Sequence, residues 1–111
     1  MMEKDRRDAI IVPPSLPTKR AAELALKYRV PAVSVPRWFA EQELMSYSAM
    51  YVELFRKAAE YVDKILKGVQ PADLPVEQPI HFELVINLRT AKTLGIEIPS
   101  TLLGRADEVI E

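Results

Sequence analysis

The sequence contains no cysteine, which excludes a disulfide-held fold, a zinc site built on cysteines and any thiol chemistry. Its charges nearly cancel, with 15 Lys and Arg against 16 Asp and Glu, so phosphate-neutralising binding to nucleic acid is not indicated. No apolar run approaches the roughly 20 residues that a membrane-spanning helix needs. The charged start, Met1–Asp8, has no secretory signal pattern, which predicts a cytoplasmic location for the chain as given.

Signals of enzyme chemistry are also missing. Three glycines spread over the chain cannot form a phosphate-binding loop, and no serine has a nucleophile-elbow context. The single histidine, His81, is expected at the surface, without a catalytic or metal-binding role. The acidic pairs Asp107/Glu108 and Glu41/Glu43 are expected on solvated faces. We therefore expect no enzyme activity and no cofactor.

What is present indicates an α/β fold within 111 residues, enough for one domain or one lobe of a larger protein. Ala9–Val12 is a β-branched run stopped by two prolines, as in a strand buried on both faces. Residues 17–28 have helical apolar spacing, with Thr18 as a candidate N-cap. A second apolar run, Ala32–Val35, completes a strand–helix–strand unit, which predicts a βαβ-based open sheet.

A third short strand is predicted at Leu44–Tyr47, followed by the strongest helical pattern in the chain. Apolar residues recur there every three or four positions, and this face is expected to pack in the core: Tyr51, Leu54, Phe55, Ala58, Val62 and Ile65. Ser48 is a candidate cap for this helix, and Gly68 is expected to end it in the left-handed conformation. Residues 1–70 are accordingly expected to form one α/β lobe.

Residues 71–79 contain three prolines and predict a stiff, extended connector to the C-terminal part, residues 80–111. Ile80–Asn87 alternates apolar and mostly polar residues, which predicts a strand at a sheet edge or in a crossing ribbon. Asn87 is expected to cap a short helix over 88–94 that Gly95 ends, and Ser100 to begin a last helical segment that continues through Ile110.

From Lys64 onward the chain carries a family resemblance in four consecutive segments: Lys64–Glu77, Phe82–Gly95, Ile98–Leu103 and Arg105–Ile110. With small gaps, they resemble the C-terminal region of bacterial ABC-transporter substrate-binding proteins of the tryptophan/tyrosine-type receptor family. The similarity runs from Asp8 to the end of the chain.

The resemblance implies a type I periplasmic-binding-protein architecture, in which two α/β lobes joined by crossing strands close around a small organic solute such as an amino acid. This chain would be the C-terminal lobe and tail only. The family's partners would be the permease subunits of an ABC importer. Its location would be periplasmic, or membrane-anchored on the extracytoplasmic side.

In an open α/β lobe, ligands bind beyond the carboxyl ends of the strands. In this chain Ser15 is expected there to donate a hydrogen bond and Arg37 to pair with a solute carboxylate, while Trp38 or Phe39 stacks on its apolar part. Residues 37–39 could equally anchor the loop. The remaining candidates for the pocket wall lie beside them: Leu16, Ser46 and Ser48. The family pattern has glycines where this chain has Glu43 and Ser48, and an Asp-Asn pair where it has Ser15-Leu16.

Two other functions stay open from the sequence. An orphan lobe could act as a self-associating module without a ligand, because a narrow sheet leaves strand edges free to pair in a homodimer or to exchange the strand Ile80–Asn87. A small α/β enzyme is the other alternative.

Overall fold

The computed structural model describes residues 8–111. The first seven residues, on which most of the signal-peptide expectation rests, lie outside the described residues. The chain divides into two units: an α/β unit made of the chain up to Ser48 together with Glu83–Glu111, and a helical unit, Ala49–Phe82. The sequence predicts a boundary near residue 70, with the long helix inside the α/β lobe. In the structure this helix belongs to the helical unit instead. No helix within residues 8–111 is long and apolar enough to cross a membrane.

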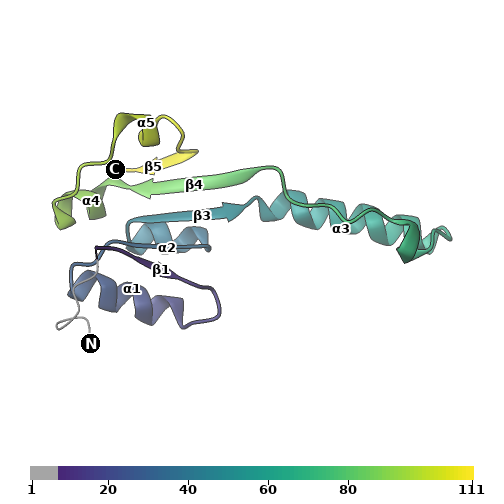
Figure 1. The fold of residues 1–111 in the computed structure, drawn as a ribbon, viewed down its shortest axis with the longest axis horizontal. Coiled ribbons are helices and arrows are strands. Elements are labelled where there is room, and N and C mark those ends of the chain that lie inside the picture. The colour runs from purple at the N-terminus through teal and green to yellow at the C-terminus, as the bar shows by residue number, and fades with distance from the viewer. Residues whose placement is uncertain (1–7) are drawn as a thin grey trace. The chain divides into compact units, whose positions relative to one another are not determined.

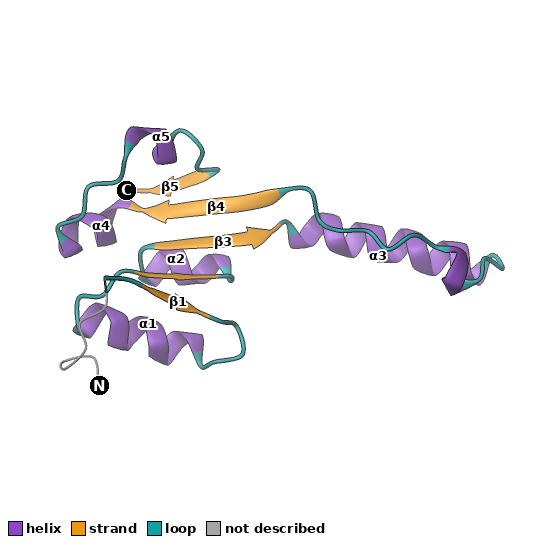
Figure 2. Cartoon of the chain, in the orientation of Figure 1, coloured by secondary structure: helices purple, strands orange, loops and turns teal. Residues whose placement is uncertain are grey.

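A five-stranded open sheet with strand order β1-β2-β3-β4-β5 forms the frame of the α/β unit (Figure 1). β1 (Ile10–Val12) pairs in parallel with β2 (Ala32–Ser34), and β2 with β3 (Met45–Ala49). β4 (Phe82–Asn87) runs opposite to β3 and pairs in parallel with β5 (Glu108–Ile110) (Figure 2). The predicted α/β open sheet is therefore confirmed.

Two helices cover one face of this sheet. α1 (Thr18–Lys27) supplies Ala22 and Ala25, and α2 (Arg37–Gln42) supplies Phe39. These residues form the buried cluster with Val12 and Ala32 of the strands. Small alanines let α1 lie close to the strands, while the one large ring fills the space between the elements.

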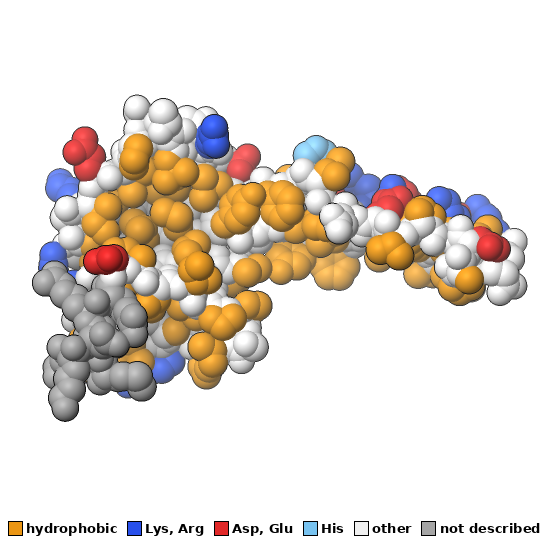
Figure 3. Space-filling model, in the orientation of Figure 1, with side chains coloured by type: hydrophobic (Ala, Val, Ile, Leu, Met, Phe, Trp, Pro, Cys, Tyr) orange, Lys and Arg blue, Asp and Glu red, His pale blue; other side chains and the backbone are white. Residues whose placement is uncertain are grey.

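Residues that point to the other face are more exposed. Ile11, between the buried and partly buried neighbours Val12 and Ile10, is 81% exposed, and Tyr47 of β3 is 54% exposed. Hydrophobic side chains gather over the strands of the α/β unit in Figure 3. In a parallel α/β sheet both faces are normally covered. Here the second face is exposed at Ile11 of β1 and Tyr47 of β3, whereas at β4 both faces are covered, because the successive residues Val85 and Ile86 are fully buried.

Local structure differs from the sequence expectations at several points. α1 and α3 begin without a side-chain cap, because Pro17 and Met50 take the N-cap positions that were expected at Thr18 and Ser48. α2 was not predicted. The last expected helical segment stops after α5 (Ser100–Leu103), and the chain then forms β5. β4 lies between β3 and β5 and not at an edge.

Asn87 ends β4 and connects three elements of the α/β unit. Its backbone N–H donates to the Leu44 carbonyl at 2.8 Å, and its side-chain amide donates to the Ala40 carbonyl at 2.8 Å. Its Oδ1 accepts from the N–H groups of Arg89 and Thr90, at 3.0 and 3.2 Å, and so caps α4 (Leu88–Leu94) as predicted. Gly95 ends this helix with φ 71°, which is also as predicted. Asn87 is 2% exposed, so these bonds are shielded from water.

The helical unit consists of α3 (Tyr51–Leu66), a short 3₁₀ turn (Pro71–Asp73) and an extended return segment. Gly68 follows α3 with φ 105°, which confirms the expected left-handed end. The expectation that the apolar face of α3 packs in the core is wrong, because no residue of this helix is buried in the chain described here. The extended return segment covers a different side of the helix.

We expect the substitution Asn87→Ala to lower the free energy of unfolding by about 2–4 kcal/mol, because it removes a helix cap and leaves buried backbone groups unpaired. Asn87→Asp keeps the capping oxygen but loses the amide donors, so it should also destabilise. Urea unfolding measures both variants, with Arg89→Ala on the exposed side of the same helix as control. Wild-type stability of Asn87→Asp would show that only the cap matters.

Candidate functional site

The carboxyl ends of β1, β2 and β3 share one edge of the sheet because these strands are parallel. β4 and β5 run the other way, so their first residues, including Glu83 and Glu108, come to the same edge. The sequence places turns and helix starts here. Proline stops β1 after Val12, and Pro36 precedes the first residue of α2. This is the edge at which open α/β sheets bind ligands.

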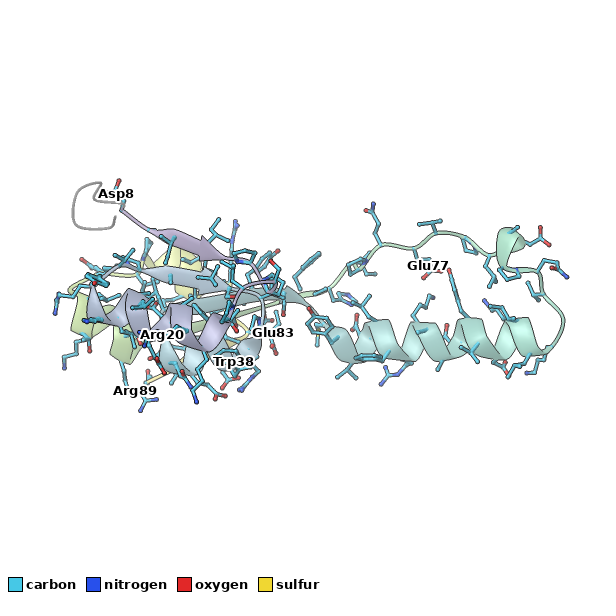
Figure 4. All side chains as sticks on the ribbon, turned by 90° about the horizontal axis from the view of Figure 1, so that it is seen from below. Asp8, Arg20, Trp38, Glu77, Glu83 and Arg89 are labelled. Atoms are coloured by element: carbon cyan, nitrogen blue, oxygen red, sulfur yellow. The ribbon has the colours of Figure 1, made fainter. Side chains whose placement is uncertain are left out.

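Four of the predicted residues are exposed or partly exposed at or next to this edge. Ser15 and Leu16 lie exposed in the turn after β1, which is closed by the Leu16 N–H bonding to the Pro13 carbonyl at 3.1 Å. Arg37 and Trp38 begin α2, and Trp38 is 37% exposed. Figure 4 shows Trp38 and Glu83 at the same end of the α/β unit.

Arg37 is held by carboxylates. Its guanidinium donates to Glu41 at 2.8 Å, one turn along α2, and to Glu108 of β5. The hydrogen bond that Arg37 donates to Glu108, with the negative charges of Glu108, Glu41 and Glu83, raises the pKa of Arg37 above its ordinary value. The guanidinium is thus fixed at the edge, and it keeps further N–H donors because only two of its nitrogens bond to groups of the described chain.

Glu108 and Glu83 are site residues that sequence reasoning missed. Glu108 was expected on a solvated face, and it lies 71 positions from Arg37. No local spacing in the sequence connects Glu108 with Arg37. The two residues come together only because β4 lies beside β3 and β5 pairs with β4.

The remaining candidates lie deeper. Phe39 is fully buried in the core cluster and presents no ring surface to a solute. Ser46 is 1% exposed, in register with Ser34 of β2, and Ser48 is half-buried at the end of β3. The structure therefore brings Ser15, Leu16, Arg37 and Trp38 to the surface of this part of the sheet and gives Phe39 a supporting place beneath them.

Glu43, between α2 and β3, is a fully buried carboxylate. One oxygen accepts from the N–H groups of Ala32, at 3.1 Å, and Leu44, at 2.5 Å. The other oxygen, Oε1, has no hydrogen-bond partner among residues 8–111. Burial away from water raises the pKa of Glu43 above its ordinary value of 4.5, and the two backbone bonds oppose that shift only in part.

The raised pKa of Glu43 makes stability depend on pH. A carboxyl whose folded-state pKa is above its unfolded value contributes most below the unfolded pKa, and that contribution is lost as pH rises through the folded pKa. We expect Glu43→Gln to raise the free energy of unfolding at pH 8 by about 1–2 kcal/mol, because the charge is no longer buried. The gain over wild type should shrink toward pH 4.5, the ordinary value.

Urea unfolding at several pH values measures this difference. Glu97→Gln, an exposed carboxyl in the same unit, is the matched control and should show no such trend. A gain from Glu43→Gln that is equal at both ends of the pH range would contradict the role given to the buried charge.

Two hollows in the described residues are lined by residues other than Arg37 and Trp38. A groove of about 440 Å³ belongs to the helical unit, between α3 and residues 77–81. A smaller one, about 210 Å³, is lined by Thr101, Leu102 and Arg105. Within residues 8–111 there is no cluster of three or more His, Cys, Asp or Glu that could hold a metal ion. The edge with Arg37 and Trp38 is thus an open wall and not an enclosed pocket.

A match to a protein family shows to which proteins this chain is related. The family described as ABC transporter substrate binding protein matches residues 16–110, nearly the whole chain. This chain belongs to that family. The family is a substrate-binding class and not an enzymatic one. No curated protein matches the chain.

Solved structures agree with the family. A conserved domain protein from Vibrio cholerae superposes with a TM-score of 0.81 at 28% identity, over 94% of this chain and 37% of its own. The ABC domain from Streptococcus pneumoniae, in complex with L-Trp, gives 0.81 and 28% over 95% of this chain and 38% of its own. A ligand-free, open substrate-binding protein with adhesive properties from Clostridium difficile gives 0.65 at 24% identity, over 92% and 36%, and supports the fold alone.

The family member described here therefore spans little more than a third of the length of each of these structures. The match implies a periplasmic-binding-protein-like fold, with helices on an open α/β sheet. It also confirms the family resemblance seen in the sequence.

Proposed function

We propose that this chain is one lobe of the solute-binding component of an ABC-type importer, which holds a small organic solute such as an amino acid by reversible binding and lobe closure. The observation that carries the proposal is the pair Arg37 and Trp38, which begins α2 at the edge where open α/β sheets bind their ligands. Family membership and the relative crystallised with L-Trp support a solute of this class.

The chemistry of the edge suits a zwitterion. The free N–H groups of Arg37 would pair with the carboxylate of the solute, because guanidinium forms directional, charge-assisted bonds to carboxylates. Glu108 and Glu83 would face its ammonium group. The exposed indole of Trp38 would pack on the side chain, with Ser15 as a further donor and Leu16 as apolar wall.

A single wall binds weakly. A micromolar site corresponds to about −8 kcal/mol, and a wall that supplies half of that free energy leaves an affinity near the millimolar range. Solute would therefore be held only when a second lobe closes over this edge. In the complete receptor the closed form would dock on the permease subunits, on the extracytoplasmic side of the membrane.

Calorimetry and fluorescence test this proposal. Trp38 is the only tryptophan, so its emission reports directly on the edge when a non-fluorescent amino acid such as L-Leu is added. L-Trp itself is titrated by calorimetry. We expect a dissociation constant of about 1 mM or weaker for the chain alone. Micromolar binding by the monomer would contradict the requirement for a second lobe.

The second measurement uses a fusion of this chain to the part of the S. pneumoniae chain that lies outside the match. We expect the fusion to bind an amino acid at least 10-fold more tightly than the chain alone, and Arg37→Ala to remove most of that gain, because a charge-assisted bidentate pair contributes about 1.5–3 kcal/mol. Arg20→Ala, which removes a surface arginine that pairs with Glu23 on α1, is the matched control. Equal affinities for the Arg37→Ala and Arg20→Ala fusions would reject the site.

A further inference from the structure

The edge that carries Arg37 and Trp38 has more carboxylates around it than basic groups. Arg37 donates to Glu41 at 2.8 Å and to Glu108 of β5. These three charged side chains are between 42% and 52% exposed, so each of them can still contact a molecule from solution. Two carboxylates thus share one guanidinium, and the positive charge of Arg37 is already balanced within the chain.

Glu83 of β4 is a third carboxylate that acts on the same guanidinium. The pKa of Arg37 is raised by its hydrogen bond to Glu108, by the charges of Glu108 and Glu41 and, in addition, by the charge of Glu83. Glu83 is half-buried, and its carboxylate forms no ion pair with a basic side chain of residues 8–111. Three carboxylates against one guanidinium leave two negative charges without a positive partner at this edge.

Trp38 adds an aromatic surface that suits a cation. Its indole is 37% exposed and follows Arg37 on α2. Its ring centroid lies 6.1 Å from that of the buried Phe39, with the planes tilted by 60°, which connects the indole to the core. Lys27 and Lys64 lie over tyrosine rings, but no basic side chain of the described chain lies over this indole. Since indole attracts cations more strongly than other aromatic rings do, Trp38 can receive one from solution.

These carboxylates do not form a metal site. The described part of the chain has no group of three or more His, Cys, Asp or Glu that could hold a metal ion. A bare Mg²⁺ or Ca²⁺ ion needs several oxygen ligands at about 2.0–2.6 Å. An organic cation is larger, so it can contact carboxylates that do not converge on one point and lie against an indole at the same time. The edge therefore favours an ammonium or guanidinium group.

We propose that the solute held at this edge carries a net positive charge, as an amino acid with an ammonium or guanidinium side chain does. Its carboxylate pairs with the remaining N–H donors of Arg37, and its α-ammonium group faces Glu108. Its side-chain cation meets Glu83 and the indole of Trp38, which Figure 4 shows at the same end of the α/β unit. The inference rests on the proposed function, because it names the substrate class of that same site.

Neutral and acidic amino acids fit this charge distribution less well. A neutral one brings one positive and one negative group, so it leaves both unpaired negative charges in place, as would the L-Trp of the S. pneumoniae complex. An acidic amino acid adds a further negative charge. A basic amino acid removes one of the two, and this difference grows when a second lobe excludes water from the site.

The emission of Trp38, the only tryptophan, tests this inference on the chain itself. L-Lys, L-norleucine and L-Glu are non-fluorescent, and each is titrated to about 100 mM, well above the millimolar affinity expected of one wall. Ionic strength is held constant at about 0.15 M. L-Norleucine has the carbon chain of L-Lys without the side-chain charge. We expect L-Lys to bind at least about fivefold more tightly than L-norleucine, and L-Glu to bind most weakly.

Salt provides a second measurement that needs no variant. Exposed charges are screened over about 8 Å at 0.15 M salt and over about 3 Å at 1 M. Raising NaCl to about 1 M should therefore remove most of the preference for L-Lys. A preference that is unchanged at 1 M would contradict its electrostatic origin.

Glu83→Gln removes one negative charge from the edge and keeps the shape of the side chain. Because Glu83 has no ion pair with the described residues to lose, the variant should fold as wild type does. We expect its affinity for L-Lys to fall to within about twofold of that for L-norleucine. Glu97→Gln changes the net charge equally at an exposed position between α4 and α5, and this matched control should keep the preference.

The outcomes separate this inference from the proposed function. Equal affinities of the wild type for L-Lys and L-norleucine would overturn the inference and leave the proposed function standing. An equal loss of preference in both glutamine variants would also overturn it, because net charge alone would then explain the result. Cadaverine has two ammonium groups and no carboxylate. A response to cadaverine but to no amino acid would keep a cation-binding edge and reject the proposed function, and no response to any of the four compounds would overturn both.

Discussion

The buried side chain of Asn87 joins the two parts of the chain that make up the α/β unit. Between Ser48 and Glu83 the chain leaves this unit to form the helical one, so β4 and β5 reach the sheet only after that excursion. Asn87 fixes their return through its amide donors to α2, its N–H bond to Leu44 and its cap on α4. Because every polar atom of this side chain has a buried partner, the junction has one arrangement.

That junction also sets the chemistry of the proposed site. With β4 fixed beside β3, β5 follows in parallel, and its first residue, Glu108, comes within reach of Arg37. The carboxylates hold the guanidinium at the edge where parallel strands end, and Trp38 follows it on the first turn of α2. Phe39 connects this turn to the core, so the position of the proposed binding residues depends on packing beneath them.

Both units of the described chain expose large apolar side chains. One sheet face leaves Ile11 and Tyr47 exposed. Helix α3 exposes Val52, Phe55 and Leu66 on the side away from the return segment. The buried cluster combines three alanines with only two larger apolar residues, Val12 and Phe39. Leu44, Val85 and Ile86 are buried outside this cluster, yet large apolar side chains remain exposed in both units of the described chain.

Sequence reasoning succeeded where a local signal exists. The β-branched runs gave β1 and β2, the three-four spacing gave α3, and the oxygen of Asn87 with Gly95 gave both ends of α4. It failed where the conformation of a segment depends on pairing with a segment far away in the sequence. Short β5 resembled a helix end because only pairing with β4 makes it a strand. β4 resembled an edge strand because it alternates apolar and polar residues, and only the order of strands in the folded sheet places it between β3 and β5.

The sequence by itself determined the family, the α/β class and the candidate residues Arg37 and Trp38, because these follow from residue order and local spacing. Only the tertiary structure decided that Glu108 pairs with Arg37 and that Phe39 belongs to the core. It also decided that the apolar side of α3 is exposed in the described chain. Periodicity shows that a helix has an apolar side but does not show which body covers it. That depends on contacts between segments far apart in the chain, or in another chain altogether.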